Sequence, residues 1–277
     1  MKLIVLGSGT SDGVPVIGCD CPVCRSPDGL NKRTRASLYI LGNAGERLVI
    51  DTGPEFRFQA LRAGITRLDA VLLTHAHADH LHGLDDVRPL CREIPLPLYA
   101  NDPTLAEMRE RFSYIFMETQ RGGGKPRIMP LPAREPFRIG CLTISPVPVK
   151  HGDLDILGWK ISEGNGDETT VGGEVPAHAA VYLTDTSSIP AASLEAIRRP
   201  DILIIGSLRE RPHATHFSFN EALSAAAGME ARRVYLTHLS HNHLHGQIED
   251  YCRLFQGNHN LIDTPMAPAY DGLELDL

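Results

Sequence analysis

A dense cluster of metal-ligating side chains directly follows an apolar segment, and no other feature of the chain constrains its fold as strongly. His75, His77, Asp79 and His80 fall within six residues, and the apolar run 70–74 leads straight into them. Neutral imidazole and carboxylate groups are ligands that Zn²⁺ and similar divalent ions prefer. The compact spacing predicts a tight loop at a strand end rather than one face of a helix. A solvated histidine-rich loop without a metal is the alternative, but it would need no buried strand before it.

Three further candidate ligands stand at or just after other apolar, β-rich segments. These are His151, Asp185 and His238. Each of them alone has a simpler explanation as a cap or a hydrogen-bonded polar group. Ligands at the ends of several buried strands converge in space, however, although they are far apart in sequence. Together with the first cluster they predict a two-metal site.

The same strand endings occur twice along the chain, in the same order. An apolar strand ends in Asp-Thr at Asp51 and again at Asp185, and another ends in Thr-His at His75 and again at His238. This repetition predicts two related β-rich halves with the site between their strand ends, although coincidence among short strands is the alternative. We expect Asp51 to orient a ligand histidine by accepting a hydrogen bond from its ring N–H.

The order His-x-His-x-Asp-His over residues 75–80 resembles the signature of the metallo-β-lactamase superfamily, and the later ligands match as well. The resemblance covers nearly the whole chain. It implies an α+β fold, the four-layer αββα sandwich of that superfamily. It also implies two divalent catalytic metals, Mn or Zn, one held by His75, His77 and His151, the other by Asp79, His80 and His238, with Asp185 between them.

Length and composition agree with one metallo-β-lactamase-like domain over residues 1–277. The chain is 42% hydrophobic and 22% charged, as in soluble globular proteins. No window reaches ~18 apolar residues, so we expect no membrane span. The apolar run at the N-terminus is too short for a signal peptide, so a cytoplasmic location is expected. The net charge of −7 argues against an extended nucleic-acid surface.

The spacing of apolar residues predicts strands alternating with helices. Thr104, Ser218 and Gly246 are the expected helix starts, and the Gly-rich stretch 163–173 is expected to be a loop. Strands are expected near residues 2–6, 36–41, 47–51, 70–74, 97–100, 127–131, 141–149, 156–162, 179–184, 202–205, 234–237 and 273–276. Helices are expected near residues 55–63, 104–116, 190–198, 219–227 and 246–255.

Three closely spaced thiols predict a second kind of metal site. Cys19, Cys21 and Cys24 fall within six residues. Without a secretory signal the compartment is expected to be reducing, so a disulfide is disfavoured. A tetrahedral structural Zn needs a fourth ligand, and His241, three residues after His238, is the candidate. A cysteine-rich turn without a metal is the alternative.

The cysteine motif narrows the resemblance to the PhnP-type phosphodiesterases, which hydrolyse phosphoribosyl 1,2-cyclic phosphate and related 2′,3′-cyclic nucleotides. The opening residues 6–15 and the run 237–241 are also similar. The resemblance implies one structural Zn, a small phosphodiester substrate and a homodimer. The implied reaction is attack on phosphorus by a hydroxide that two metal ions bridge, ~3.5–4 Å apart.

Two residues outside the ligand set are candidates for contact with substrate. His216 matches a histidine that the family places at its active site, so we expect it to serve the leaving group as a general acid or electrophile. A helix-capping or surface histidine is the alternative. Arg209 is a candidate for contact with substrate phosphate, and a surface arginine is an equally good interpretation.

Two other functions stay open. The first is that of a tRNA 3′-processing endonuclease of the same superfamily, which would require an extended Gly- and Pro-rich arm. The one comparable stretch, 120–127, is short. The second is that of a non-catalytic metal-binding relative involved in cofactor biosynthesis. The intact set of metal ligands argues against it.

Overall fold

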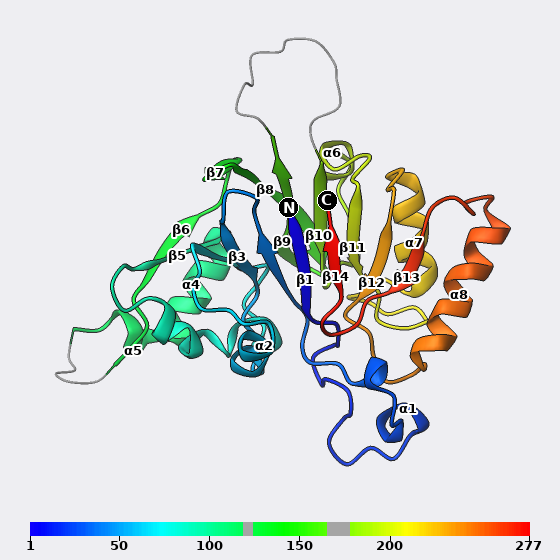
Figure 1. Cartoon of the computed structure of the whole chain (residues 1–277), viewed down its shortest axis with the longest axis horizontal. Helices are drawn as coiled ribbons and strands as arrows, with labels where there is room; N and C mark the ends of the chain where they lie inside the picture. The colour runs from blue at the N-terminus through cyan, green and yellow to red at the C-terminus, as the bar shows by residue number, and fades with distance from the viewer. Residues whose placement is uncertain (119–123, 165–177) are drawn as a thin grey trace, which may run out of the picture.

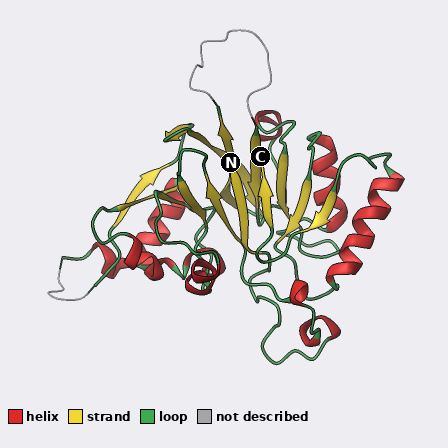
Figure 2. Cartoon of the chain, in the orientation of Figure 1, coloured by secondary structure: helices red, strands yellow, loops and turns green. Residues whose placement is uncertain are grey.

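Two β-sheets lie face to face in the middle of the molecule, and helices cover their outer faces (Figure 1, Figure 2). The structure is a computed structural model that describes residues 1–118, 124–164 and 178–277. One sheet carries α2 (Phe56–Arg62), α4 (Asp102–Arg111) and α5 (Ser113–Phe116) on its outside. The other carries α6 (Ala191–Ala196), α7 (Phe219–Gly228) and α8 (His245–Asn258). The predicted αββα sandwich is confirmed.

The first sheet is antiparallel at one side and parallel at the other, because helical crossovers connect its later strands. Parallel strands place their carboxyl ends at one edge of the sheet, which is where the first ligand cluster begins. In spatial order the described strands are β14 (Glu274–Asp276), β1 (Lys2–Gly7), β2 (Ser37–Leu41), β3 (Arg47–Ile50), β4 (Ala70–Leu72), β5 (Leu96–Ala100) and β6 (Ile128–Pro132).

The second sheet repeats this arrangement, with three parallel pairings followed by three antiparallel ones. The ligands His151, Asp185 and His238 lie at or after the carboxyl ends of β8, β10 and β12. In spatial order the described strands are β13 (Met266–Pro268), β12 (Val234–Thr237), β11 (Ile202–Gly206), β10 (Ala179–Leu183), β9 (Leu154–Glu163), β8 (Leu142–His151) and β7 (Phe137–Ile139).

Apolar side chains from the two inner faces form the central core. Ile40 and Leu48 of the first sheet and Trp159 and Ile204 of the second belong to one buried cluster. Two further clusters join each sheet to its own helices. Because both faces of each sheet are covered, the central strands are apolar at successive positions instead of alternating. This rigid frame holds the strand ends that carry the ligands.

Several predicted helix boundaries are wrong. The helix expected over 104–116 is interrupted at Phe112, which leaves the helical conformation and packs into the core, so that α4 and α5 are separate. Asn101, rather than Thr104, caps α4 with its side chain. Leu244, rather than Gly246, precedes α8. Ser218 does cap α7, and forms a capping box with Glu221.

Other short elements were not predicted at all. They are β7, β13, the helices α1 (Pro22–Arg25) and α3 (Ala78–Leu81), and the 3₁₀ helices η1 (Gly29–Asn31) and η2 (Leu84–Leu90). Pro268 at the end of β13 is accommodated because this strand is at the sheet edge. Of the expected loop 163–173, Glu163 belongs to β9, Gly164 lies outside any strand, and the rest falls outside the described residues. Among the described residues, no helix combines the length and apolarity that a bilayer crossing requires.

Candidate metal centre

The loop after β4 brings the first ligand cluster into position. His75 and His77 lie in the extended segment after the strand, while Asp79 and His80 lie in the one-turn helix α3. The expectation that a loop alone would carry all four ligands was therefore wrong for the last two. The short helix turns Asp79 and His80 to a different side from His75 and His77. One segment can therefore serve two metal ions.

The structure places the predicted metal ligands in two adjoining groups. Within each group the ligand atoms lie within 4.8 Å of one another. The first group is His75, His77 and His151, and the second is Asp79, His80, Asp185 and His238. These are the two sets that the sequence resemblance implies, with Asp185 now placed among the second.

Asp185 reaches both groups with different oxygen atoms. Its Oδ1 lies 3.2 Å from Nε2 of His80 and 3.2 Å from Nε2 of His238. Its Oδ2 lies 4.0 Å from Nε2 of His75 and 4.0 Å from Nε2 of His151. A carboxylate in this orientation can bind one cation with each oxygen. The geometry is therefore suited to a pair of metal ions with Asp185 between them.

The protonation chemistry of these buried groups also suits cations. Nε2 of His75 is buried and has no hydrogen-bond partner among the described residues, and Nε2 of His80 is buried beside carboxylate oxygens of Asp79 and Asp185, at 3.0 Å and 3.2 Å. Buried polar atoms are otherwise almost always paired, so the unpaired nitrogen of His75 is suited to a metal. Burial alone would raise the pKa of Asp185, but His238 and His80 hold the pKa of that carboxyl well below its usual range. Asp185 is thus the anionic form that binds a cation.

Asp51 lies directly behind the ligands, as predicted. Its Oδ2 lies 2.7 Å from Nδ1 of His80, which leaves Nε2 of that ring for the metal side. Asp51 also accepts hydrogen bonds from the backbone N–H and the hydroxyl of Thr74, both at 2.8 Å. Asp51 and Asp185 both adopt positive φ angles, 62° and 51°, so the repeated Asp-Thr ending has the same backbone conformation in both halves.

His151 is oriented by a contact that the sequence analysis missed. Its Nδ1 lies 2.7 Å from the backbone carbonyl oxygen of Thr215, to which it can donate. The same loop carries His216, whose Nδ1 lies 3.8 Å from Oδ2 of Asp185. His151, Asp185 and His216 form a third group whose geometry could hold a metal. The structure therefore places His216 at the metal centre, and its position alone also allows it to be a ligand.

The structure does not bring Arg209 into contact with the ligand groups. Its side chain forms no ion pair or hydrogen bond within the described part of the chain, and its Nε is buried. Arg209 acts instead on its neighbour His213. Partial desolvation lowers the pKa of His213, and the charge of Arg209 lowers that pKa too.

The three cysteines lie around His241, the candidate fourth ligand named in the sequence analysis. Its Nδ1 lies 3.4 Å from Sγ of Cys19, 3.6 Å from Sγ of Cys21 and 3.4 Å from Sγ of Cys24. The backbone N–H of Cys24 lowers the pKa of Cys21 to about 6. Three thiols and one imidazole nitrogen at these distances have the donor set of a structural zinc site. The cysteines lie on and beside α1, at the lower right in Figure 1.

Comparison with known proteins identifies the family. A family model described as a beta-lactamase superfamily domain matches residues 46–239. The crystal structure of a diphosphatase from the PhnP family is 40% identical, superimposes with a TM-score of 0.81, and matches 99% of this chain and 96% of that protein. The chain belongs to the PhnP family of the metallo-β-lactamase superfamily. The chain has the metallo-β-lactamase fold, and that fold implies divalent metal ions.

Two other similar proteins show how far the likeness extends. An octanoyltransferase of Porphyromonas gingivalis is 38% identical over 276 residues, which is 99% of this chain and 51% of that protein. This chain thus spans about half the length of that relative. Zn²⁺-bound PqqB from Methylobacterium extorquens is 18% identical, with a TM-score of 0.78 and full coverage of both chains. That likeness shows the fold alone.

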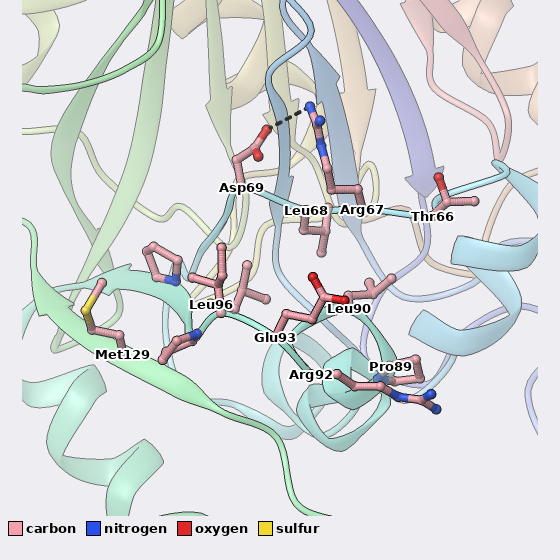
Figure 3. A pocket seen from close by; sticks show the side chains of 13 residues that line it. Thr66, Arg67, Leu68, Asp69, Pro89, Leu90, Arg92, Glu93, Leu96 and Met129 are labelled. Carbon is pink, nitrogen blue, oxygen red and sulfur yellow. Dashed lines mark ion pairs between the residues drawn. The ribbon is translucent and has the colours of Figure 1, made fainter.

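A pocket of about 520 Å³ lies at the other end of β4 from the two groups of metal ligands (Figure 3). It is lined by residues around Asp69, which precedes β4, whereas the ligand cluster follows that strand. Arg67 at its rim is paired with Asp69 at 3.5 Å. The pocket therefore lies at the opposite end of the strand and contains none of the predicted site residues.

Proposed function

We propose that this chain is a dinuclear metal-dependent phosphodiesterase acting on small cyclic substrates, such as cyclic phosphoribose or 2′,3′-cyclic nucleotides. One observation supports it above all. The two oxygens of Asp185 face two different groups of buried ligands. Two divalent ions, Mn or Zn, would there activate water and offset the charge of the phosphoryl oxygens. The resemblance of residues 6–15, 19–24 and 237–241 to the PhnP-type phosphodiesterases supports the choice of a phosphodiester.

The chain's own residues would orient this chemistry. Asp51 holds the ring of His80, and the carbonyl of Thr215 holds the ring of His151. Such contacts fix the tautomer of a ligand histidine, so that Nε2 is free to bind. The buried walls around Asp185 exclude water from most of the centre, which strengthens electrostatic interactions there. The frame thus keeps the ligands in one arrangement before substrate binds.

His216 would assist departure of the leaving oxygen. Burial, together with the charge of the neighbouring His238, lowers the pKa of His216 to about 3. The imidazole is therefore neutral at neutral pH in the free protein. We infer that its neutral N–H donates a hydrogen bond to the leaving oxygen. An imidazolium would form there only where the charge of the bound phosphate raises the pKa of His216. Arg209 lies on the same loop as His216, between β11 and α7. It would contact the substrate phosphate on the side away from the metal ligands.

Hydrolysis of diphosphates is a second candidate function. The PhnP-family relative that is 40% identical is itself described as a diphosphatase. A diphosphate bond and a phosphodiester bond both need attack on phosphorus and neutralisation of phosphoryl oxygens. The same ligand groups would therefore suit either substrate. The shape of the wall around the metal ligands decides between the two substrates.

Two other functions receive less support. The stretch 120–127, compared above with the arm of a tRNA-processing enzyme, lies partly outside the described residues, and the chain carries a net charge of −7. The negative net charge does not favour an RNA substrate. The intact set of ligands in two adjoining groups counts against a non-catalytic role.

A substrate panel tests the proposed function. Metal-reconstituted protein is offered a cyclic phosphoribose, 2′,3′-cyclic nucleotides, linear phosphodiesters, a nucleoside diphosphate, a lactam and a precursor tRNA. We expect the small cyclic diesters to give the highest kcat/KM, because they present one phosphorus to a compact centre. Faster hydrolysis of the diphosphate would favour the second candidate. Fully metal-loaded protein that hydrolyses no phosphorus ester would contradict both.

We further propose that Cys19, Cys21, Cys24 and His241 hold one structural Zn. A structural Zn contributes directly to folding because the unfolded chain offers no preformed site. The loop from Thr237 to His241 would then serve both sites, since His238 belongs to the catalytic group. The zinc would keep the N-terminal segment against that loop.

Replacement of Cys21 by serine is expected to remove one zinc per chain and to lower the melting temperature. The catalytic ligands stay the same in kind, because none of them is a cysteine. Elemental analysis and thermal unfolding measure both effects. Cys141→Ser is the matched control, since Cys141 is exposed and outside the group. An unchanged zinc content in Cys21→Ser would refute the site.

A further inference from the structure

A buried arginine, Arg33, lies beside the segments that carry the cysteine group and has no charged partner among the described residues. Arg33 is 2% exposed and is among the largest fully buried side chains. Its Nη1 donates one hydrogen bond, at 3.2 Å, to the backbone carbonyl of Ser240. Its Nε and Nη2 have no hydrogen-bond partner among the described residues. An arginine is almost never buried in this way unless something compensates its charge.

No carboxylate compensates the guanidinium of Arg33 directly. Within the described residues, none lies within 4.0 Å of it. Asp271 and Asp28 act on it only at longer range. Both oxygens of Asp271 already accept hydrogen bonds, from Ser8 and Thr34. Burial lowers the pKa of Arg33 to about 10. The side chain is therefore still charged at neutral pH, and a buried charge without a partner is strongly destabilising.

Two of the segments next to Arg33 lead into the cysteine group. Ser240, which accepts its hydrogen bond, directly precedes His241. On the other side, Val14 and Arg33 exchange two backbone hydrogen bonds of 2.8 Å. Val14 packs in turn in one small cluster with Val23 and Cys24. Arg33 is thus held between the loop that carries the histidine ligand and the segment that carries the thiols.

The charge of a zinc–thiolate group would explain this burial. One Zn²⁺ with three thiolates and one neutral imidazole carries a net charge of −1. We propose that Arg33 is the buried counter-charge of this group and sets its affinity for zinc, an inference that rests on the structural zinc proposed above. The adjacent Lys32 also reaches this region, with Nζ 3.2 Å from the carbonyl oxygen of Cys24. Lys32 is partly exposed, so water screens its charge.

Zinc affinity of the cysteine group tests the role of Arg33. The catalytic ligands are loaded with Mn²⁺, and zinc is removed by a competing chelator while the thiols protected from alkylation are counted. We expect Arg33→Met to weaken zinc binding about 10-fold to 100-fold, as for loss of a nearby buried charge. Arg33→Lys keeps the charge and should remain within about 3-fold of the wild type, as should the control Lys32→Met, whose charge is screened.

Each outcome bears on a different statement. Wild-type protein without zinc-protected thiols would show that the structural zinc proposal itself is wrong. Zinc-protected thiols in the wild type, with unchanged affinity in Arg33→Met, would overturn the counter-charge. Equal weakening in Arg33→Lys and Arg33→Met would also overturn it, because charge would then not be the cause. Arg33→Gln, which is neutral and polar, replaces Arg33→Met if that variant does not fold.

Discussion

Replacement of Asp185 by alanine is expected to abolish most hydrolysis while leaving the fold in place. Asp185 alone among the ligands presents one oxygen to each group, so its loss affects both metal positions at once. We expect at least the ~10²–10³-fold loss in kcat that follows removal of one preorganised electrostatic group. We expect a smaller loss of stability. Alanine removes the buried negative charge of Asp185, which the metal ions would otherwise have to balance. Phosphodiesterase rates, metal content and thermal unfolding measure the three effects.

Two further variants separate the causes of that loss. Asp185→Asn keeps the size of the side chain and tolerates the positive φ of this position, but it cannot present two anionic oxygens. It should therefore lose metal and activity while unfolding like the metal-free wild type. Asp201→Asn is the control, since Asp201 pairs with Arg232 outside the ligand groups. Full metal occupancy and a near wild-type rate in Asp185→Ala would contradict the bridging role.

Replacement of His216 by alanine is expected to slow the hydrolysis of substrates with poor leaving groups by ~10²–10⁴-fold, the usual contribution of a general acid or electrophile. An alkyl or ribose phosphodiester should show this loss. A nitrophenyl phosphodiester should lose much less, because nitrophenolate leaves without a proton. Metal content should not change, because the resemblance assigns His216 no ligand role. Rates on both substrates with one preparation of the variant measure the difference.

The controls for His216 address its second possible role. His216 lies close enough to His151 and Asp185 to bind a metal, and loss of metal in His216→Ala would show that it does. Equal losses on both substrates with full metal would instead show that it positions the phosphate. His213→Ala is the neighbouring control, with ring centroids 5.2 Å apart. It should change both rates little, because His213 is exposed and not among the ligand groups.

Much of the metal centre could be predicted from the sequence because its ligands follow strands that are themselves recognisable. Continuous apolar runs identify buried strands, and several His and Asp residues that each follow such a run together predict a metal site, although one of them alone would not. The spacing of the three cysteines similarly predicts a thiolate site. Local signals were also sufficient for the cap at Ser218, where the capping box lies within four residues. Short elements such as β13 escaped, since their periodicity is too brief to be detected.

The sequence by itself determined which residues have the chemistry of metal ligands and that they lie at strand ends. Only the tertiary structure decided how they meet. The orientation of Asp185 between two groups depends on the order of strands in the second sheet and on how the two sheets pack. The contact of Thr215 with His151 and the burial of Arg33 beside Ser240 join segments 64 and 207 residues apart. No local pattern encodes such contacts, because they arise from the packing of the whole sandwich.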